Sequence, residues 1–202
     1  MVGDVRDKDR LQLAIRNVDI VFHAAAMKHI DICEQNPFDA VKTNVFGTSN
    51  ILEASIIENV SKFIFISTDK ATNPSSTLGA SKLLAERLTL DASSYVGHGK
   101  TIFSIVRFGN VLGSRGSVFQ IFHKQIEHNE SLTVTDEKMT RFIMSLSEAS
   151  KMILKVTEIA KDGEIFILKM PSVKILELAK GMIRVFKNKF PNREISNEIK
   201  IL

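Results

Sequence analysis

The sequence has little cysteine and no long apolar run. Cys33 is the only cysteine among the 202 residues, which excludes a disulfide framework and favours a reducing compartment. Met1 is followed almost at once by charged residues instead of the apolar core of a secretory signal. No apolar run approaches the ~18 residues that a membrane helix needs. We therefore expect a cytoplasmic protein without a membrane segment.

Clusters of like charge and of metal ligands are absent too. The formal net charge is +4, and basic residues are interleaved with acidic ones, as in residues 4–10. Because no basic stripe carries aromatic residues, nucleic acid is not expected as a partner. The histidines show no metal-ligand spacing, since His123 and His128 lie on different faces of one helical pattern. No metal site is predicted.

A glycine-rich phosphate loop is also missing. The ten glycines never form the pattern Gly-x-Gly-x-x-Gly, which in dinucleotide-binding sheets brings the backbone close to a pyrophosphate. The nearest approach, residues 97–99, follows a helical pattern and lacks the third glycine. If the chain binds a dinucleotide, its own sequence does not supply this cradle.

What the sequence does contain is an alternation of short apolar runs with helical patterns. This alternation predicts βαβ units and hence an α/β fold with a parallel sheet and right-handed crossovers. The expected strands cover residues 18–22, 62–67, 101–107, 132–134 and 164–169, and the expected helices cover residues 36–59, 77–94, 118–126, 145–160 and 173–187.

Reactive side chains gather just after the second of these strands. The apolar run at residues 63–66 is typical of a buried parallel strand, and it is followed by Ser67, Thr68, Asp69 and Lys70. Ligands of open α/β sheets bind at the carboxyl ends of the strands. The chain thus delivers hydroxyls, a carboxylate and an amine to the expected site, and the next helix adds a second amine, Lys82.

Several further motifs accompany this stretch in a fixed order. With them, the chain resembles the extended short-chain dehydrogenases/reductases, and in particular the inverting UDP-N-acetylglucosamine 4,6-dehydratases of polysaccharide and glycan biosynthesis. The resemblance extends over about residues 1–187. Its motifs lie at residues 3–7, 23–26, 36–38, 42–48, 66–71, 107–111 and 113–117.

The resemblance implies an enzyme that oxidises a UDP-sugar at C4 with NADP, loses water across C5–C6 and returns the hydride to C6. NAD is not excluded as the cofactor. By the same resemblance, Lys70 is the base at C5 and Asp69 the acid for the C6 hydroxyl. Thr68 bonds the C4 oxygen, and Lys82 holds the nicotinamide ribose. The alternative interpretation of Asp69 and Lys70 is a solvated loop ion pair.

The resemblance also implies binding residues. On the cofactor side, Asn44 lies on a helix that braces the catalytic loop, and residues 23–26 have a second interpretation as a tight packing corner. Arginine suits a diphosphate because its guanidinium bonds two oxygens at once, although Arg115 and Arg141 could also be surface cations. The implied residues are Asp4, Val5, His23, Ala24, Ala25, Ala26 and Lys82 for the cofactor, and Asn110, Arg115 and Arg141 for the substrate.

The chain departs from the family pattern in three places. Leu78 stands where these enzymes carry a tyrosine, four residues before Lys82, and leucine has no proton to exchange. The first strands and the glycine loop are not in the sequence, and since a βαβ unit takes ~30 residues, we expect roughly 50–60 residues of the fold to lie upstream of Met1. The substrate-binding part also stops early, at Leu202.

The expected architecture is therefore a partial Rossmann-like sheet with a small C-terminal substrate-binding part. We expect residues 1–130 to form the partial dinucleotide-binding domain and residues 131–202 the partial substrate-binding region, intermixed with the first. Strand 18–22 would have a bare edge, so a homo-oligomer or self-association is expected. Two other functions stay open, a sugar-nucleotide 4-epimerase and a non-catalytic relic or interaction module.

Overall fold

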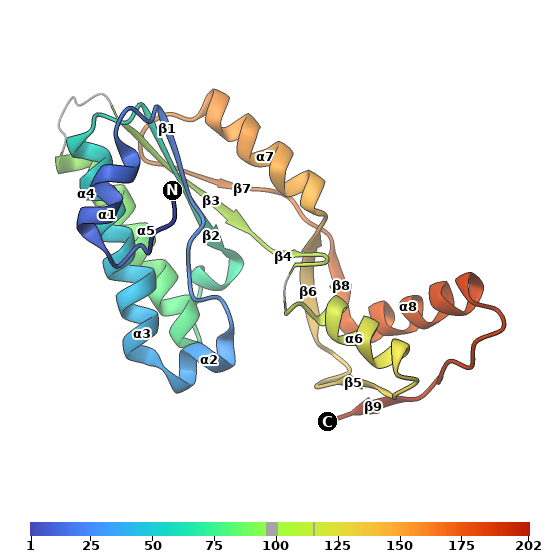
Figure 1. Cartoon of the computed structure of the whole chain (residues 1–202). Helices are drawn as coiled ribbons and strands as arrows, with labels where there is room; N and C mark the ends of the chain where they lie inside the picture. The colour runs from blue at the N-terminus through green and yellow to red at the C-terminus, as the bar shows by residue number, and fades with distance from the viewer. Residues whose placement is uncertain (96–100, 115) are drawn as a thin grey trace. The chain divides into compact units, whose positions relative to one another are not determined.

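The computed structural model describes residues 1–95, 101–114 and 116–202. The chain forms two compact units (Figure 1). The first unit consists of residues 1–108 and 151–168, and the second of residues 109–150 and 169–202. Each unit has its own apolar core, and each is described separately below.

The first unit is built on a sheet of four parallel strands. In the described residues its order is β1 (Ile20–His23), β2 (Lys62–Thr68), β3 (Ile102–Phe108) and β7 (Glu164–Ile167). All three pairings are parallel. The central strands form because their apolar runs can be buried on both faces. The expected α/β fold with a parallel sheet of the Rossmann type is thus confirmed.

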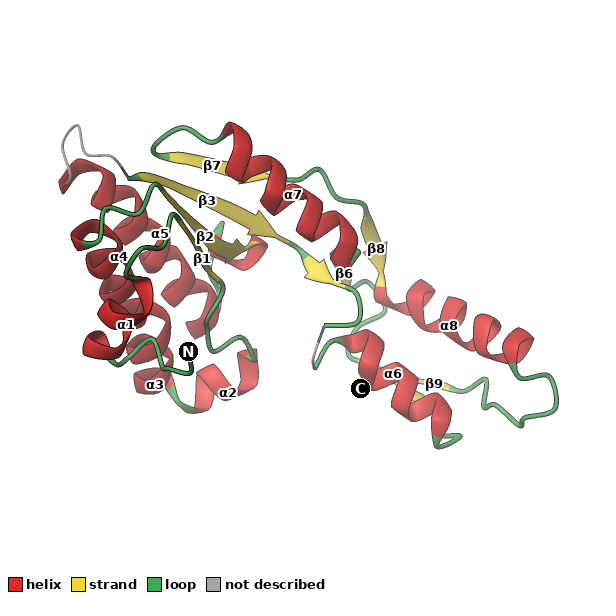
Figure 2. Ribbon diagram, turned by 45° about the horizontal axis from the view of Figure 1, so that its top comes forward, coloured by secondary structure: helices red, strands yellow, loops and turns green. Residues whose placement is uncertain are grey.

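Helices cover both faces of this sheet. Figure 2 shows α1 (Lys8–Ile15), α4 (Gly47–Ile57) and α5 (Thr77–Tyr95) gathered on one face. Together with the sheet they bury a cluster that includes Phe63, Phe65 and Phe103. On the other face lies α7 (Leu146–Ile159), which meets β2 where the Lys62 ammonium donates to the carbonyl oxygens of Thr157 and Glu158.

The helix expected at residues 36–59 contains a change of helical type. It begins as α3 (Pro37–Val41) after the short α2 (Ile30–Gln35), passes through the π-helical turn Lys42–Phe46, and continues as α4. A π turn inserts one residue into the hydrogen-bond ladder, and such turns often occur at functional sites. Here it carries Asn44, which is 1% exposed.

The second unit combines two small sheets with two helices. One sheet holds β4 (Asn110–Val111), β6 (Thr140–Met144) and β8 (Ser172–Lys174), and the other pairs β5 (Leu132–Val134) with β9 (Ile199–Ile201). The amphipathic helices α6 (Val118–Glu127) and α8 (Ile175–Lys189) bury their apolar faces between them. The expected helix at 173–187 therefore starts two residues late, because residues 172–174 pair with β6.

The observed units do not coincide with a single division of the chain. The polypeptide passes between them after Phe108, after Ser150 and after Leu168. The units are defined by packing and do not show what each one binds. The division into a dinucleotide-binding domain at residues 1–130 and a substrate-binding region at residues 131–202 therefore stays a prediction. Among the described residues no helix is suited to crossing a membrane, and no group of three or more acidic, histidine or cysteine side chains is arranged to hold a metal ion.

Candidate active site

The reactive stretch lies at the carboxyl end of β2, where the sequence predicts it. Thr68 is the last residue of the strand and caps a short 3-10 helix, Asp69–Ala71. The Thr68 hydroxyl donates to Asp69 Oδ1 over 2.9 Å, and Lys70 Nζ donates to the same oxygen over 2.9 Å. One carboxylate oxygen therefore accepts a hydrogen bond from each neighbour, which brings three of the four predicted catalytic side chains into a single hydrogen-bonded group.

This group is accessible but its backbone is held firmly. The side chains of Lys70 and Asp69 are 27% and 22% exposed, so a ligand can reach them. Ala71 is fully buried, and a Cβ on Gly79 would lie 2.6 Å from the Lys70 carbonyl oxygen. Only glycine lets the first turn of α5 approach the loop this closely. The turn thus anchors the backbone that carries Asp69 and Lys70.

Lys82 projects from α5 into the same region and is almost fully buried. Its ammonium donates to the carbonyl oxygen of Ile66 over 2.9 Å and lies 4.6 Å from the centre of the Phe65 ring. Burial lowers the pKa of Lys82 to about 8, although the carboxylate of Glu86, one helical turn further on, acts in the opposite direction. Lys82 thus loses its proton more readily than an exposed lysine does.

His23 lies beneath Lys82, against the same phenylalanine. Its ring centre is 5.4 Å from that of Phe65, and its Nε2 is 2.9 Å from Thr48 Oγ1. The Thr48 hydroxyl has one proton, and it donates this proton to the Asn44 carbonyl oxygen over 2.7 Å. It must therefore accept from His23, which fixes the proton of the neutral imidazole on Nε2. Burial lowers the pKa of His23 to about 3, with a further contribution from Lys82.

These two side chains allow a test of whether a dinucleotide fits. His23 Nδ1 is a buried acceptor without a partner in the described part of the chain, and a buried polar atom of this kind calls for a ligand or water. Lys82 offers ammonium protons beside it. A ribose, whose hydroxyls both donate and accept, suits this pair, so the nicotinamide end of a dinucleotide fits. The glycine cradle for its pyrophosphate is not among the 202 residues.

The other predicted cofactor residues lie on loops beside α4 and after β1. Two hydrogen bonds from the Arg6 side chain, together with one from its backbone, lower the pKa of Asp4 to about 2. Val5 docks on α4 through its carbonyl, which accepts from Asn50 over 3.0 Å. Ala24 and Ala25 are exposed and Ala26 is half-buried. Their contact with a cofactor stays a prediction.

Leu78 points away from the reactive group. It is 5% exposed and packs in a small cluster with Cys33 and Ala40, flanked by Met27. Its side chain therefore supports the junction of α2, α3 and α5. The leucine side chain can neither take nor give a proton.

Two of the predicted substrate residues, Asn110 and Arg141, lie in the second unit. Arg141 lies on β6 and donates to the carbonyl oxygen of Thr140 over 2.9 Å, and Asn110 opens β4 half-buried. Arg115 lies outside the described residues. Gly113 and Gly116 both have positive φ, and the Gln120 amide ties them together. Substrate binding by these residues stays a prediction.

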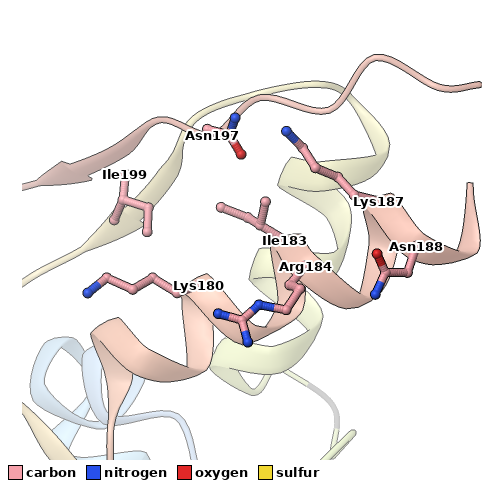
Figure 3. A pocket seen from close by; sticks show the side chains of 7 residues that line it. All are labelled: Lys180, Ile183, Arg184, Lys187, Asn188, Asn197 and Ile199. Atoms are coloured by element: carbon pink, nitrogen blue, oxygen red, sulfur yellow. The ribbon is translucent and has the colours of Figure 1, made fainter. Parts of the chain in front are cut away.

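A hollow of about 340 Å³ lies elsewhere on the second unit. Figure 3 shows that Lys180, Arg184 and Lys187 project from α8 around it, with Asn197 and Ile199 on the facing segment. None of the residues that line it is one of the predicted binding residues. The hollow therefore does not identify the site, which rests on the group after β2.

Sequence reasoning missed a buried ion pair next to this group. Glu86 of α5 is 1% exposed, and both its oxygens accept from the Arg107 guanidinium of β3, at 2.9 and 2.6 Å. Two signals were available in the sequence. Glu86 follows Lys82 by four residues on one helix face, and Arg107 lies near the end of a mostly apolar strand. A charge in such a place requires a partner.

Comparison with known families gives this group its context. The family described as "Polysaccharide biosynthesis protein" matches residues 1–202. The chain belongs to this family. The resemblance to proteins of polysaccharide biosynthesis inferred from the motifs is therefore confirmed.

Three relatives of this family member carry different names. A protein of Methanocaldococcus jannaschii, named only as an uncharacterized membrane protein, is 57% identical over all of this chain and 60% of its own length. A UDP-N-acetylglucosamine 4,6-dehydratase (inverting) of Campylobacter jejuni is 47% identical over 90% of this chain and 54% of its own. A UDP-glucose 4-epimerase of Rickettsia bellii is 42% identical over 93% and 55%. The chain thus spans a little over half the length of these relatives.

Solved structures agree on the fold. Pen from Bacillus thuringiensis superposes with a TM-score of 0.95 at 45% identity, over 100% of this chain and 61% of its own. DesIV, a dTDP-glucose 4,6-dehydratase of Streptomyces venezuelae solved with NAD, gives a TM-score of 0.84 at 20% identity, over 99% of this chain and 65% of its own. The second similarity establishes the fold alone.

Proposed function

We propose that this polysaccharide biosynthesis protein carries the dehydration centre of a sugar-nucleotide 4,6-dehydratase, with UDP-N-acetylglucosamine as substrate. The observation that supports this most is the shared hydrogen bonding of Thr68 and Lys70 to one oxygen of Asp69. Loss of water across C5–C6 needs a base and an acid side by side. A nicotinamide cofactor, NADP before NAD, supplies the oxidation at C4 and the reduction at C6 when bound.

Proton balance within the pair follows from its geometry. A charged lysine with a charged aspartate holds the same number of protons as the neutral amine with the neutral acid. Transfer of one proton along the 2.9 Å bond from Lys70 Nζ to Asp69 Oδ1 interconverts the two forms. Lys70 then accepts the C5 proton, and Asp69 gives its proton to the departing C6 hydroxyl. The charged pair is regenerated.

Other residues have supporting roles in this proposal. Thr68 donates to the sugar oxygen at C4, and Lys82 with His23 holds the nicotinamide ribose. Asp4, Val5 and residues 24–26 line the rest of the cofactor. Asn110, Arg115 and Arg141 bind the sugar diphosphate, where an arginine fork matches phosphate oxygens. We place the protein in the cytoplasm, because its single cysteine favours a reducing compartment.

A 4-epimerase is the second candidate, since one relative carries that name. Epimerisation relies on a proton-exchanging tyrosine at position 78 and has no use for Asp69 and Lys70. The buried Leu78 therefore favours dehydration. The third possibility, a non-catalytic interaction module, is favoured by the missing glycine cradle and disfavoured by the intact group after β2.

One experiment separates these candidates. The chain is incubated with UDP-N-acetylglucosamine and NADP, and then with NAD, and the sugar products are analysed by NMR. We expect a 4-keto-6-deoxy product, reduced 10²–10⁴-fold in Asp69→Asn, as is typical for loss of an acid–base group. Asp91→Asn, on the same unit but at the far end of α5, is the control. A C4 epimer would support the second candidate. If the chain forms no product and binds no cofactor, an enzyme role for this chain is rejected.

A further inference from the structure

The buried pair of Glu86 and Arg107 is built with more precision than a chance ion pair. Arg107 Nε and Nη2 each donate to a different oxygen of Glu86, at 2.9 and 2.6 Å. The glutamate is 1% exposed, and the arginine side chain is 16% exposed. A two-point contact of this kind fixes the plane of both groups. The pair thereby holds the end of β3 against the middle of α5.

The same pair holds both ends of the loop that carries the reactive side chains. Ser67 Oγ donates to Glu86 Oε1 over 2.6 Å, and Arg107 Nη1 donates to Thr72 Oγ1 over 3.3 Å. Ser67 immediately precedes residues 68–71, and Thr72 immediately follows them. One ion pair therefore contacts the residue on each side of the segment that contains Asp69 and Lys70.

Stability alone does not account for this arrangement. Removing two charges from water costs more than their attraction often returns, and apolar residues of similar volume are commonly as stable. An apolar pair would also leave the Ser67 hydroxyl, which is in a 5% exposed residue, without its acceptor. What the charged pair adds is direction, since each of its hydrogen bonds constrains the loop in a different place.

We propose that Glu86 and Arg107 are positioning residues that fix residues 68–71 at both ends and so set the geometry between Asp69 and Lys70. This inference rests on the proposed function of that pair. Neither Glu86 nor Arg107 itself exchanges a proton with substrate. The link on one side is Ser67, at the end of β2, and the link on the other is Thr72, which also donates its backbone N–H to the Asp69 carbonyl oxygen at 3.2 Å.

The variant Thr72→Val tests the inference without disturbing the core. It removes the acceptor of Arg107 Nη1 but leaves Glu86 fully bonded, so the fold is retained. Amide hydrogen exchange at Lys70 and Thr72, measured by NMR, is expected to rise about fivefold, the factor for a lost hydrogen bond of about 1 kcal/mol. The matched control is Thr133→Val, which removes the acceptor of Gln125 Nε2 on the second unit.

Two further variants grade the effect. Arg107→Lys keeps the charge but not the fork, and Glu86→Gln keeps the shape but not the charge. We expect exchange at residues 70–72 to rise in both, by more than in Thr72→Val. If exchange in Thr72→Val stays at the level of the Thr133→Val control, the positioning role is wrong, whether or not the other two variants fold.

Measurement of kcat and KM distinguishes a positioning role from a purely structural one. In Thr72→Val we expect kcat for the dehydrated product to fall while KM stays unchanged, because substrate binding does not involve the threonine. A rise in KM with kcat unchanged would contradict the inference. If the unmodified chain yields no product, the proposed function fails by itself, and the exchange measurement still decides whether the pair positions the loop.

Discussion

At the scale of single residues, the neutral state of His23 has a measurable consequence. Its folded pKa of about 3 lies below the ordinary value of about 6.5. Between these pH values the unfolded chain binds a proton that the folded chain does not. Stability contributed by the neutral ring is therefore complete above pH 6.5 and is lost as the pH falls toward 3, by about 1.4 kcal/mol per pH unit.

We predict that His23→Gln removes this part of the acid sensitivity. Glutamine retains a donor for Thr48 but does not titrate. Urea unfolding of both proteins between about pH 4 and pH 7 gives the difference in slope. Equal slopes in wild type and His23→Gln would show that the ring is protonated in the fold.

The single-residue features also show what sequence reasoning could reach. The position of Thr68, Asp69 and Lys70 was predictable because a buried strand has only one carboxyl end, and ligands meet there. The hydrogen bonds of Thr68 and Lys70 to one oxygen of Asp69 were not predictable, since they depend on the 3-10 turn after the strand. The burial of Glu86 was not predictable, since its spacing of four residues after Lys82 is equally typical of a solvated helix pair. Only the depth of the helix in the fold makes it a buried partner.

At the scale of elements, the π turn at Lys42–Phe46 places Asn44 where it serves three partners. Its Oδ1 accepts from the Met27 N–H at 2.8 Å, and its Nδ2 donates to the Met27 carbonyl oxygen and to Ser81 Oγ, both at 3.0 Å. Ser81 immediately precedes Lys82. The asparagine therefore connects the segment after β1 to the turn of α5 that bears the buried lysine.

We predict that Asn44→Ala is strongly destabilising. It leaves buried backbone and hydroxyl groups without partners, each at a cost of about 1–3 kcal/mol. Asn50→Ala, a few residues along the same helix, removes a single hydrogen bond to Val5 and should cost about 1 kcal/mol. Chemical unfolding of the two variants measures the difference. A cost for Asn44→Ala no greater than for Asn50→Ala would contradict the role of the π turn.

Long elements with a regular pattern were predictable, and short ones were not. The strands at β2 and β3 and the helices α5, α6 and α7 agree with their apolar periodicity. The short helices α1 and α2 were missed, α1 because its start depends on Asp7 accepting from the Arg10 N–H. Strand β9 pairs with β5 across more than sixty residues, and such distant pairing leaves no local signal.

At the scale of the whole molecule, β1 lies at an edge of the described sheet. Ile20 and Phe22 on this strand are 40% and 45% exposed. An apolar edge strand with free backbone groups pairs readily with another chain. We therefore expect β1 to mediate any self-association. The expected homo-oligomer itself stays a prediction.

We predict that Phe22→Lys reduces self-association of the chain, because a charge on an edge strand opposes pairing. Sedimentation velocity over a range of concentrations measures the effect. The control is Phe38→Lys. Phe38 lies on α3 and is 82% exposed, so this variant adds the same charge away from the sheet and should leave association unchanged. A wild-type chain that is a monodisperse monomer and melts cooperatively would show that the edge is harmless.

The proposed chemistry has its most direct test in the fate of the C5 hydrogen. The reaction is run in D₂O with UDP-N-acetylglucosamine and a nicotinamide cofactor, and deuterium in the sugar is located by NMR. We expect the 4-keto-6-deoxy product to carry deuterium at C5, because Lys70 exchanges the abstracted proton with solvent. Asp69→Asn removes the acceptor of the Lys70 proton, so this variant and Lys70→Met should both leave the recovered substrate without deuterium at C5. A product that retains its original C5 hydrogen would contradict the assignment of Asp69 and Lys70 as the acid and base of a dehydratase.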